Sequence, residues 1–251
     1  MLGGQQEPRH YPPVKQEPRH YPPVKQYPIH EVFYTFQGEG CHMGLPALFI
    51  RTYGCPVKCP WCDSAGTWHQ NYKPESVPKW TVSELVDATV YANADRVVIT
   101  GGEPAIHDLS DLFLALRSRR TLVHVETSGI LEIKGDADWI TLSPKKWSPP
   151  IPEAIWKADE IKIIVEEPAD IPLYLEMVGR DCPVGIPIWL HPEWSKREDK
   201  KVLSAIVQEV KRRRGGIIRA GWQLHKLYSA DKYDTRSAPL VPLGGDPAKG
   251  Y

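Results

Sequence analysis

The chain has 251 residues, of which 41% are hydrophobic, so it can fill one large core or two small ones. Its 31 Lys and Arg residues balance 31 Asp and Glu residues, and this zero net charge gives no reason to expect a nucleic-acid partner. No stretch is apolar enough to cross a membrane or to act as a secretory signal, so we expect no membrane partner, a cytoplasmic location and a small-molecule substrate.

The first segment, residues 1–26, carries a tandem repeat. The sequence QEPRHYPPVK occurs at 6–15 and again at 16–25. Because the repeat is rich in proline and polar groups, it predicts a disordered, extended tail. We interpret this tail as a linker, and the alternative is a docking segment that presents Tyr11 and Tyr21.

From residue 27 onward, apolar runs alternate with segments of helical period. The run Ala47–Tyr53 predicts a buried strand, and Thr81 and Glu84 form a capping-box pattern that opens a helix reaching about Asn93. The basic run Lys211–Arg214 is interpreted as the end of a helix rather than as a phosphate site. We expect further strands at 96–100, 122–125, 139–142, 161–165 and 186–190, and further helices at the apolar stripe Leu109, Leu112, Phe113 and Leu116, at 170–179 and at 196–214.

A strand followed by a helix, repeated along the chain, predicts a parallel sheet. With about six such strands, we favour an α/β fold of the incomplete (βα)6-barrel type over a flat doubly wound sheet, which periodicity alone does not separate from it. In either fold, the loops at the carboxyl ends of the strands carry the chemistry. We therefore expect a tail at 1–26, a catalytic domain at 27–228 and a C-terminal extension at 229–251.

Three of the five cysteines lie in one short loop directly after the first predicted strand. Cys55, Cys59 and Cys62, spaced C-x-x-x-C-x-x-C, can converge on one face of a 4Fe-4S cluster and leave its fourth iron open to a chelating ligand. The alternative is zinc, but structural zinc needs a fourth protein ligand, and no other Cys or His sits at a zinc-finger spacing. We favour the cluster and interpret Cys41 and Cys182 as ordinary core or surface residues.

The cysteine loop and the motif Thr100–Pro104 (TGGEP) resemble the radical S-adenosylmethionine (SAM) superfamily. Glycines let the backbone approach a ligand closely, and a nearby carboxylate can receive an ammonium group. Taken alone, TGGEP would be interpreted as a turn with a carboxylate at a helix start. The resemblance implies that SAM binds at Trp61, Cys62, Asp63, Gly101, Gly102, Glu103, Ser143, Pro144 and Lys145.

Within that superfamily, the chain resembles the 7-carboxy-7-deazaguanine synthase family. The motifs that carry this resemblance are spread over residues 30–228: Tyr34–Gly40, Phe49–Arg51, Cys62–Ser64, Glu126–Gly129, Ser143–Lys145 and Gln223–Lys226. The resemblance implies that 6-carboxy-5,6,7,8-tetrahydropterin is converted into 7-carboxy-7-deazaguanine with loss of ammonia, a step toward queuosine. It also implies a 4Fe-4S cluster, SAM and Mg²⁺ as cofactors, a homodimer, and a reductase or a flavodoxin- or ferredoxin-type electron donor.

The same resemblance assigns the pterin contacts and the magnesium ligand. An amide side chain suits the donor and acceptor edge of a pterin, and an arginine at a strand end suits a carboxylate. The alternative for Arg51 is a structural salt bridge, and the alternative for Glu39 is a surface charge. The implied substrate-binding residues are Phe36, Gln37, Gly38, Arg51, Thr100 and His225, and the implied Mg²⁺ ligand is Ser64.

Two other functions stay open on the sequence. One is a radical SAM activase that generates a glycyl radical on a partner enzyme, which would share the cysteine loop but need no pterin pocket. The other is a non-catalytic zinc-binding interaction module. The chain also departs from the family at its end, because residues 229–251 follow the last motif. It is therefore open whether Asp234, Arg236 or the chain end replaces the C-terminal carboxylate contact of the family.

Overall fold

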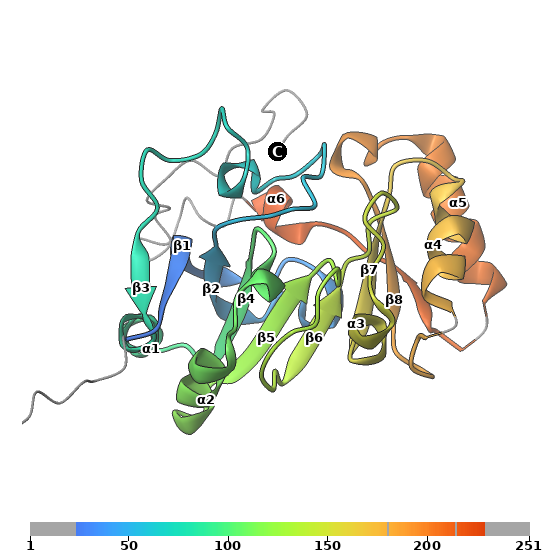
Figure 1. The fold of residues 1–251 in the computed structure, drawn as a ribbon. Coiled ribbons are helices and arrows are strands. Elements are labelled where there is room, and N and C mark those ends of the chain that lie inside the picture. Colours follow the sequence, from blue (N-terminus) through green and yellow to red (C-terminus); the bar gives the residue numbers. More distant parts are fainter. Residues whose placement is uncertain (1–23, 180, 214, 229–251) are drawn as a thin grey trace, which may run out of the picture.

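The computed structural model describes residues 24–179, 181–213 and 215–228 (Figure 1). Most of the predicted tail and all of the predicted extension at 229–251 lie outside these residues. The first strand, β1 (Gln26–Phe36), begins at Gln26, so the last residue that we assigned to the tail belongs to the sheet.

The strands form a nine-stranded sheet in the order β3-β1-β2-β4-β5-β6-β7-β8-β9. From β2 onward all neighbouring strands are parallel, whereas β1 is antiparallel to both β2 and β3. The bounds are β2 Pro46–Thr52, β3 Lys79–Thr81, β4 Arg96–Gly101, β5 Leu122–Thr127, β6 Trp139–Leu142, β7 Glu160–Val165, β8 Ile188–Pro192 and β9 Ile218–Ala220.

The strand order decides between the two folds that the sequence left open. A doubly wound sheet reverses its strand order at a switch point, whereas here each parallel strand from β2 to β9 lies beside its predecessor among them. Successive right-handed crossovers in one direction place the helices on one face of the sheet and curve it into a partial barrel. Figure 1 shows this arrangement, with α1 to α5 on the outer side.

The helices agree with the expected pattern. Thr81 and Glu84 form a complete capping box at the start of α1 (Val82–Tyr91). The predicted apolar stripe of α2 (Ser110–Ser118) is buried throughout. The helix expected at 196–214 begins later, since Asp199 caps α5 and accepts hydrogen bonds from two backbone N–H groups. The remaining helices are α3 Pro152–Trp156, α4 Asp170–Gly179, α5 Lys200–Arg212 and α6 Leu224–Tyr228.

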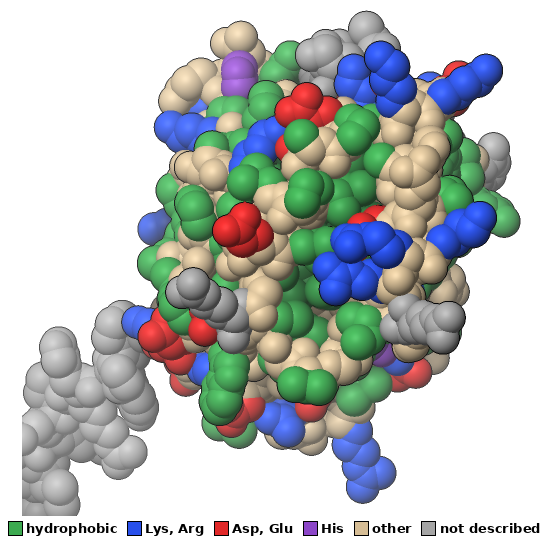
Figure 2. Space-filling model, turned by 90° about the vertical axis from the view of Figure 1, so that its right-hand side faces the viewer, with side chains coloured by type: hydrophobic (Ala, Val, Ile, Leu, Met, Phe, Trp, Pro, Cys, Tyr) green, Lys and Arg blue, Asp and Glu red, His purple; other side chains and the backbone are tan. Residues whose placement is uncertain are grey.

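Lys211 and Arg212 of the predicted basic run form the end of α5. Arg212 and Arg213 both form ion pairs with Glu209 on the same helix, at 2.7 and 3.1 Å. The face in Figure 2, turned by 90° from Figure 1, mixes positive, negative and hydrophobic side chains. In the part of the chain that the structure describes, no helix has the length and apolar character needed to span a membrane.

Alternation along β7 shows how the sheet separates its two faces. Ile161, Ile163 and Val165 belong to a hydrophobic cluster with α3, α4 and α5. The intervening residues Glu160 and Lys162 are buried as well but are charged. They therefore face the inside of the barrel.

Candidate functional site

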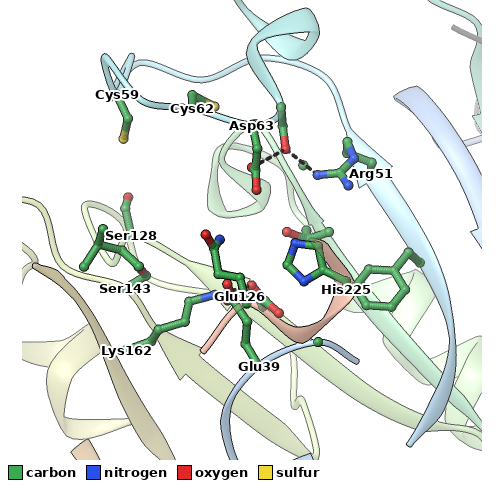
Figure 3. Close-up of a pocket in the computed structure, with 18 of the residues that line it drawn as sticks. Glu39, Arg51, Cys59, Cys62, Asp63, Glu126, Ser128, Ser143, Lys162 and His225 are labelled. Atoms are coloured by element: carbon green, nitrogen blue, oxygen red, sulfur yellow. Dashed lines mark hydrogen bonds and ion pairs between the residues drawn. The ribbon is translucent and has the colours of Figure 1, made fainter. Parts of the chain in front are cut away.

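A pocket of about 690 Å³ opens at the carboxyl ends of the parallel strands, as expected for a βα fold (Figure 3). It is lined by every residue that the sequence assigned to the cluster, SAM, substrate or magnesium, with the exception of Pro144. Pro144 is buried beside the pocket. His191, on β8, is fully buried and does not line the pocket.

The cysteine loop leaves β2 through a tight backbone turn. Gly54 has a φ of +102° and Lys58 a φ of +55°, both in the left-handed region. The turn is held by a hydrogen bond from the Gly54 N–H to the Thr67 carbonyl at 2.9 Å, and the indole of Trp147 donates to the Val57 carbonyl at 3.1 Å. These contacts turn the cysteine side chains toward the pocket.

The donor set of this loop fits an iron–sulfur cluster. Cys55, Cys59 and Cys62 are free thiols that line the pocket. Three thiolates from one short loop can each bind a different iron of a cubane, so this donor set suits such a cluster.

Burial controls the protonation of these thiols. It raises the pKa of Cys59 to about 12 and, together with the neighbouring Asp63 carboxylate, the pKa of Cys62 to about 11. Burial also raises the pKa of Cys55. Because metal ligation requires the thiolate, a cluster held by these three cysteines would displace their protons.

The end of β4 packs directly against the cysteine loop. The Glu103 N–H donates to the Gly54 carbonyl at 2.8 Å, and a Cβ at Gly102 would lie 2.0 Å from that same oxygen. A glycine is therefore required at Gly102 for this approach. The Glu103 carboxylate accepts hydrogen bonds from Thr127 Oγ1 at 2.6 Å and from the Ser128 N–H at 2.8 Å. It joins the ends of β4 and β5 at the pocket wall.

A third wall comes from the loop after β6. Lys145 is buried, and its Nζ donates to the Ser143 carbonyl and hydroxyl at 2.5 and 2.7 Å. The same ammonium lies 5.5 Å from the ring centroid of Trp61. Burial lowers the pKa of Lys145 although the nearby Cys59 opposes this effect. Ser143, Lys145 and Trp61 thus meet beside the cysteine loop.

Arg51 both lines the pocket and forms the structural salt bridge that we considered as its alternative. Its Nε lies 2.6 Å from a carboxylate oxygen of Glu31, and its Nη1 donates to the Ser64 hydroxyl. Burial by itself would lower the pKa of Arg51, but Glu31 and Asp63 outweigh it and raise the pKa. The pairing of Arg51 with Thr100 between β2 and β4 puts these two residues at the same height in the barrel.

Asp63 and Ser64 offer oxygen atoms beside Arg51. The Ser64 hydroxyl donates to Asp63 Oδ1 at 3.3 Å, and Asp63 also lies 3.7 Å from Lys226. Figure 3 shows Asp63 beside Arg51. Burial by itself would raise the pKa of Asp63, but Lys226, His225 and Arg51 outweigh it and lower the pKa. Asp63 is therefore ionised at neutral pH.

The loop after β1 and the last helix meet across the pocket. The Leu224 N–H donates to the Gly38 carbonyl at 2.9 Å. A Cβ at Gly38 would lie 2.1 Å from His225 Nδ1, so the histidine ring rests on the backbone of this glycine. Gln37 Nε2 donates to Glu126 at 2.8 Å from the neighbouring position.

The surface-charge interpretation of Glu39 is wrong. Glu39 is 6% exposed and forms an ion pair with the buried Lys162, because both side chains point into the barrel. Lys162 and Glu126 both line the pocket, and neither was assigned to the site from the sequence. A signal was present in the strand EIKIIV of β7, where two charged residues alternate with buried isoleucines.

Comparison with known proteins gives consistent results. The model of the Radical SAM superfamily matches residues 49–178. The chain is 41% identical over 180 residues to the 7-carboxy-7-deazaguanine synthase of Synechocystis sp. (strain ATCC 27184 / PCC 6803 / Kazusa), covering 71% of this chain and 84% of that protein. It is 37% identical over 172 residues to the enzyme of the same name from Escherichia coli (strain K12), covering 60% of this chain and 77% of that protein.

A solved structure is similar as well. The crystal structure of QueE from Escherichia coli superposes with a TM-score of 0.68 at 32% sequence identity. The match covers 80% of this chain and 95% of that chain.

Proposed function

The chain belongs to the 7-carboxy-7-deazaguanine synthase family of radical SAM enzymes, and we propose which of its residues hold the cofactors and the substrate. Its function is the conversion of 6-carboxy-5,6,7,8-tetrahydropterin into 7-carboxy-7-deazaguanine with loss of ammonia, in queuosine biosynthesis. The relatives decide for this function over the glycyl-radical activase and the zinc-binding module.

We assign the cluster and SAM to the walls of the pocket that the loops after β2, β4 and β6 form. Cys55, Cys59 and Cys62 are the cluster ligands, and the glycines at the end of β4 leave room for the methionyl end of SAM. When bound, the reduced cluster and SAM supply the radical that removes a hydrogen atom from the substrate. The protein orients the two groups and shields them from water. The proposed SAM contacts are Trp61, Cys62, Asp63, Gly101, Gly102, Glu103, Ser143 and Lys145.

The opposite side of the pocket receives the pterin. Arg51 offers a planar guanidinium to the substrate carboxylate, and Gln37 offers an amide to the ring edge. His225 closes the pocket over Gly38, which excludes water from the reacting carbon. The proposed substrate contacts are Phe36, Gln37, Gly38, Arg51, Thr100 and His225.

We propose Ser64 as the protein ligand of magnesium. Magnesium prefers oxygen ligands and retains several waters, so one hydroxyl beside an ionised carboxylate is a suitable binding site. Asp63 supplies that carboxylate next to Ser64. Arg51 donates to the same hydroxyl, so the ion and the guanidinium can both face the substrate carboxylate.

The remaining partners are proposals that rest on family membership. They are a homodimeric assembly, a reductase or a flavodoxin- or ferredoxin-type electron donor, and action in the cytoplasm. The assembly can be measured by light scattering of the purified chain.

The observation that carries the assignment is one pocket of about 690 Å³ whose walls hold both the three free cysteine thiols and Arg51. Its test is an anaerobic assay of the reconstituted protein with reductant, SAM and 6-carboxytetrahydropterin, with and without Mg²⁺. We expect the deazapurine in the mass spectrum and faster turnover with Mg²⁺. An intact cluster without product would contradict the substrate assignment, and equal rates in both samples would contradict the magnesium site.

Replacing Arg51 by lysine tests the carboxylate contact. Lysine keeps the charge but lacks the planar fork, so a charge-assisted hydrogen bond is lost and KM for the pterin should rise about tenfold. Iron content should stay unchanged because no cysteine is altered. Arg117→Lys is the matched control, since Arg117 forms an exposed ion pair with Asp138 away from the pocket. Unchanged kinetics in R51K would remove Arg51 from the substrate site.

A further inference from the structure

A buried lysine joins two walls of the barrel interior. Lys162 on β7 is 7% exposed, and its ammonium lies 2.9 Å from Glu126 Oε2 on β5 and in direct contact with Glu39. Figure 3 shows the three side chains pointing toward one another, on the side of the pocket away from Cys59 and Cys62. One positive and two negative charges in a nearly dry site are costly to separate.

Strand β7 also contacts the residues that follow Glu39 in the loop after β1. Glu160 precedes Lys162 by two residues, so both side chains lie on one face of β7. Its carboxylate accepts the Cys41 N–H at 2.8 Å. Gly40 has a φ of +67°, and a Cβ there would lie 2.4 Å from Glu160 Oε1. The loop after β1 is therefore attached to β7 at two consecutive points.

Glu160 itself is held firmly. Its carboxylate also accepts hydrogen bonds from Thr141 Oγ1 at 2.8 Å and from the indole N–H groups of Trp139 and Trp189 at 3.2 and 2.9 Å. These donors come from β6 and β8, on either side of β7. The contact of Glu160 with Gly40 and Cys41 thus stays in place when the contact of Lys162 with Glu39 is removed.

The contacts of Lys162 with Glu126 and Glu39 hold in place the residues that face the proposed ligand. Gln37 donates to Glu126, and Glu126 in turn accepts from the Lys162 ammonium, so Lys162 holds the acceptor of this contact. The other carboxylate that it binds, Glu39, follows Gln37 by two residues. Burial by itself would lower the pKa of Lys162, but Glu126 and Glu39 outweigh it and raise the pKa, so the lysine stays charged.

We propose that Lys162 is a positioning residue for the pterin, which fixes Gln37 and Glu126 so that their amide and carboxylate face the donor and acceptor edge of the ring. This inference rests on the proposed function, because it concerns the same pocket. It assigns no direct contact with the substrate to Lys162. The residues that face the substrate are thereby held in place by β7. The residues that face the cluster and SAM lie on the loops after β2, β4 and β6.

The test uses reconstituted full-length protein carrying Lys162→Met. We expect KM for the pterin to rise by about tenfold or more, since two hydrogen-bonding groups lose their orientation, while kcat changes by less than about threefold. Iron content and the dissociation constant for SAM, measured without substrate, should equal those of the wild type. Lys157→Met is the matched control, because Lys157 forms an ion pair with Glu132 at 2.6 Å on the surface.

A second variant guards against misfolding of K162M, in which the carboxylates of Glu39 and Glu126 lose their counter-ion. The double variant Glu39→Gln with Lys162→Met keeps the net charge of the trio at −1, so it should fold and still show the raised KM. Lys162→Arg retains the charge and should recover part of the affinity.

The outcomes separate this inference from the proposed function. If the wild type itself yields no deazapurine, the proposed function fails. If the wild type is active and the double variant keeps its KM within about twofold of the wild-type value, the positioning role of Lys162 is wrong. A fall in kcat with unchanged KM in the same variant would also overturn it.

Discussion

Cys59→Ala is expected to lose the cluster and all turnover. With one thiolate removed, two sulfurs remain to hold a cubane that needs three protein ligands here. The Cys59 side chain is partly exposed in the pocket wall, so the free energy of unfolding of the cluster-free protein should change by only about 1 kcal/mol or less. Iron and sulfide content, visible absorbance and SAM cleavage measure the effect.

The control for this variant is Cys182→Ala. Cys182 is also a free, half-buried thiol, but it packs beside a hydrophobic cluster and does not line the pocket. It should retain iron, sulfide and turnover. SAM cleavage at the wild-type rate in C59A would show that the ligand assignment is wrong.

Gly102→Ala is expected to cost about 100-fold or more in turnover, because a displacement of about 1 Å at a reacting centre has effects of this size. The new Cβ would lie 2.0 Å from the Gly54 carbonyl oxygen and 3.2 Å from the Cys55 Cβ. The nearest atom is backbone and cannot rotate aside, so the end of β4 and the cysteine loop must separate. Such overpacking should lower the free energy of unfolding by about 1–3 kcal/mol.

Gly179→Ala separates this steric effect from a general effect of alanine. Gly179 ends α4, and a Cβ there meets no atom within 4 Å. The substitution should leave turnover unchanged and leave stability equal or slightly higher, since alanine favours a helix. Wild-type turnover of G102A would contradict the close packing of β4 on the cysteine loop. Thermal unfolding and the anaerobic assay measure both variants.

Much of the fold could be predicted because its parallel strands are short apolar runs. The run of β2, the capping box of α1 and the stripe of α2 each depend on local pattern, and each lies where it was expected. β1 was not predicted as a strand. Its buried residues include His30 and Glu31, and it begins at a proline-rich segment, so neither apolarity nor alternation is evident.

The site divides in the same way. Motifs within one loop, such as Cys55–Cys62 and Thr100–Pro104, could be found because their residues are consecutive in the sequence. Lys162 depends on Glu39, which lies 123 residues away, and no local pattern relates the two. The alternation in EIKIIV indicates that Lys162 faces the barrel interior, but its partners can be assigned only from the three-dimensional arrangement.

The contact between His225 and Gly38 has a consequence for how the protein is made. The cysteine loop and the end of β4 are synthesised within the first half of the chain and can meet early. The wall that His225 forms over Gly38 needs a segment made much later, since the Leu224 N–H donates to the Gly38 carbonyl. A nascent chain can thus bring the cysteine loop and the end of β4 together while the rest of the pocket is still incomplete.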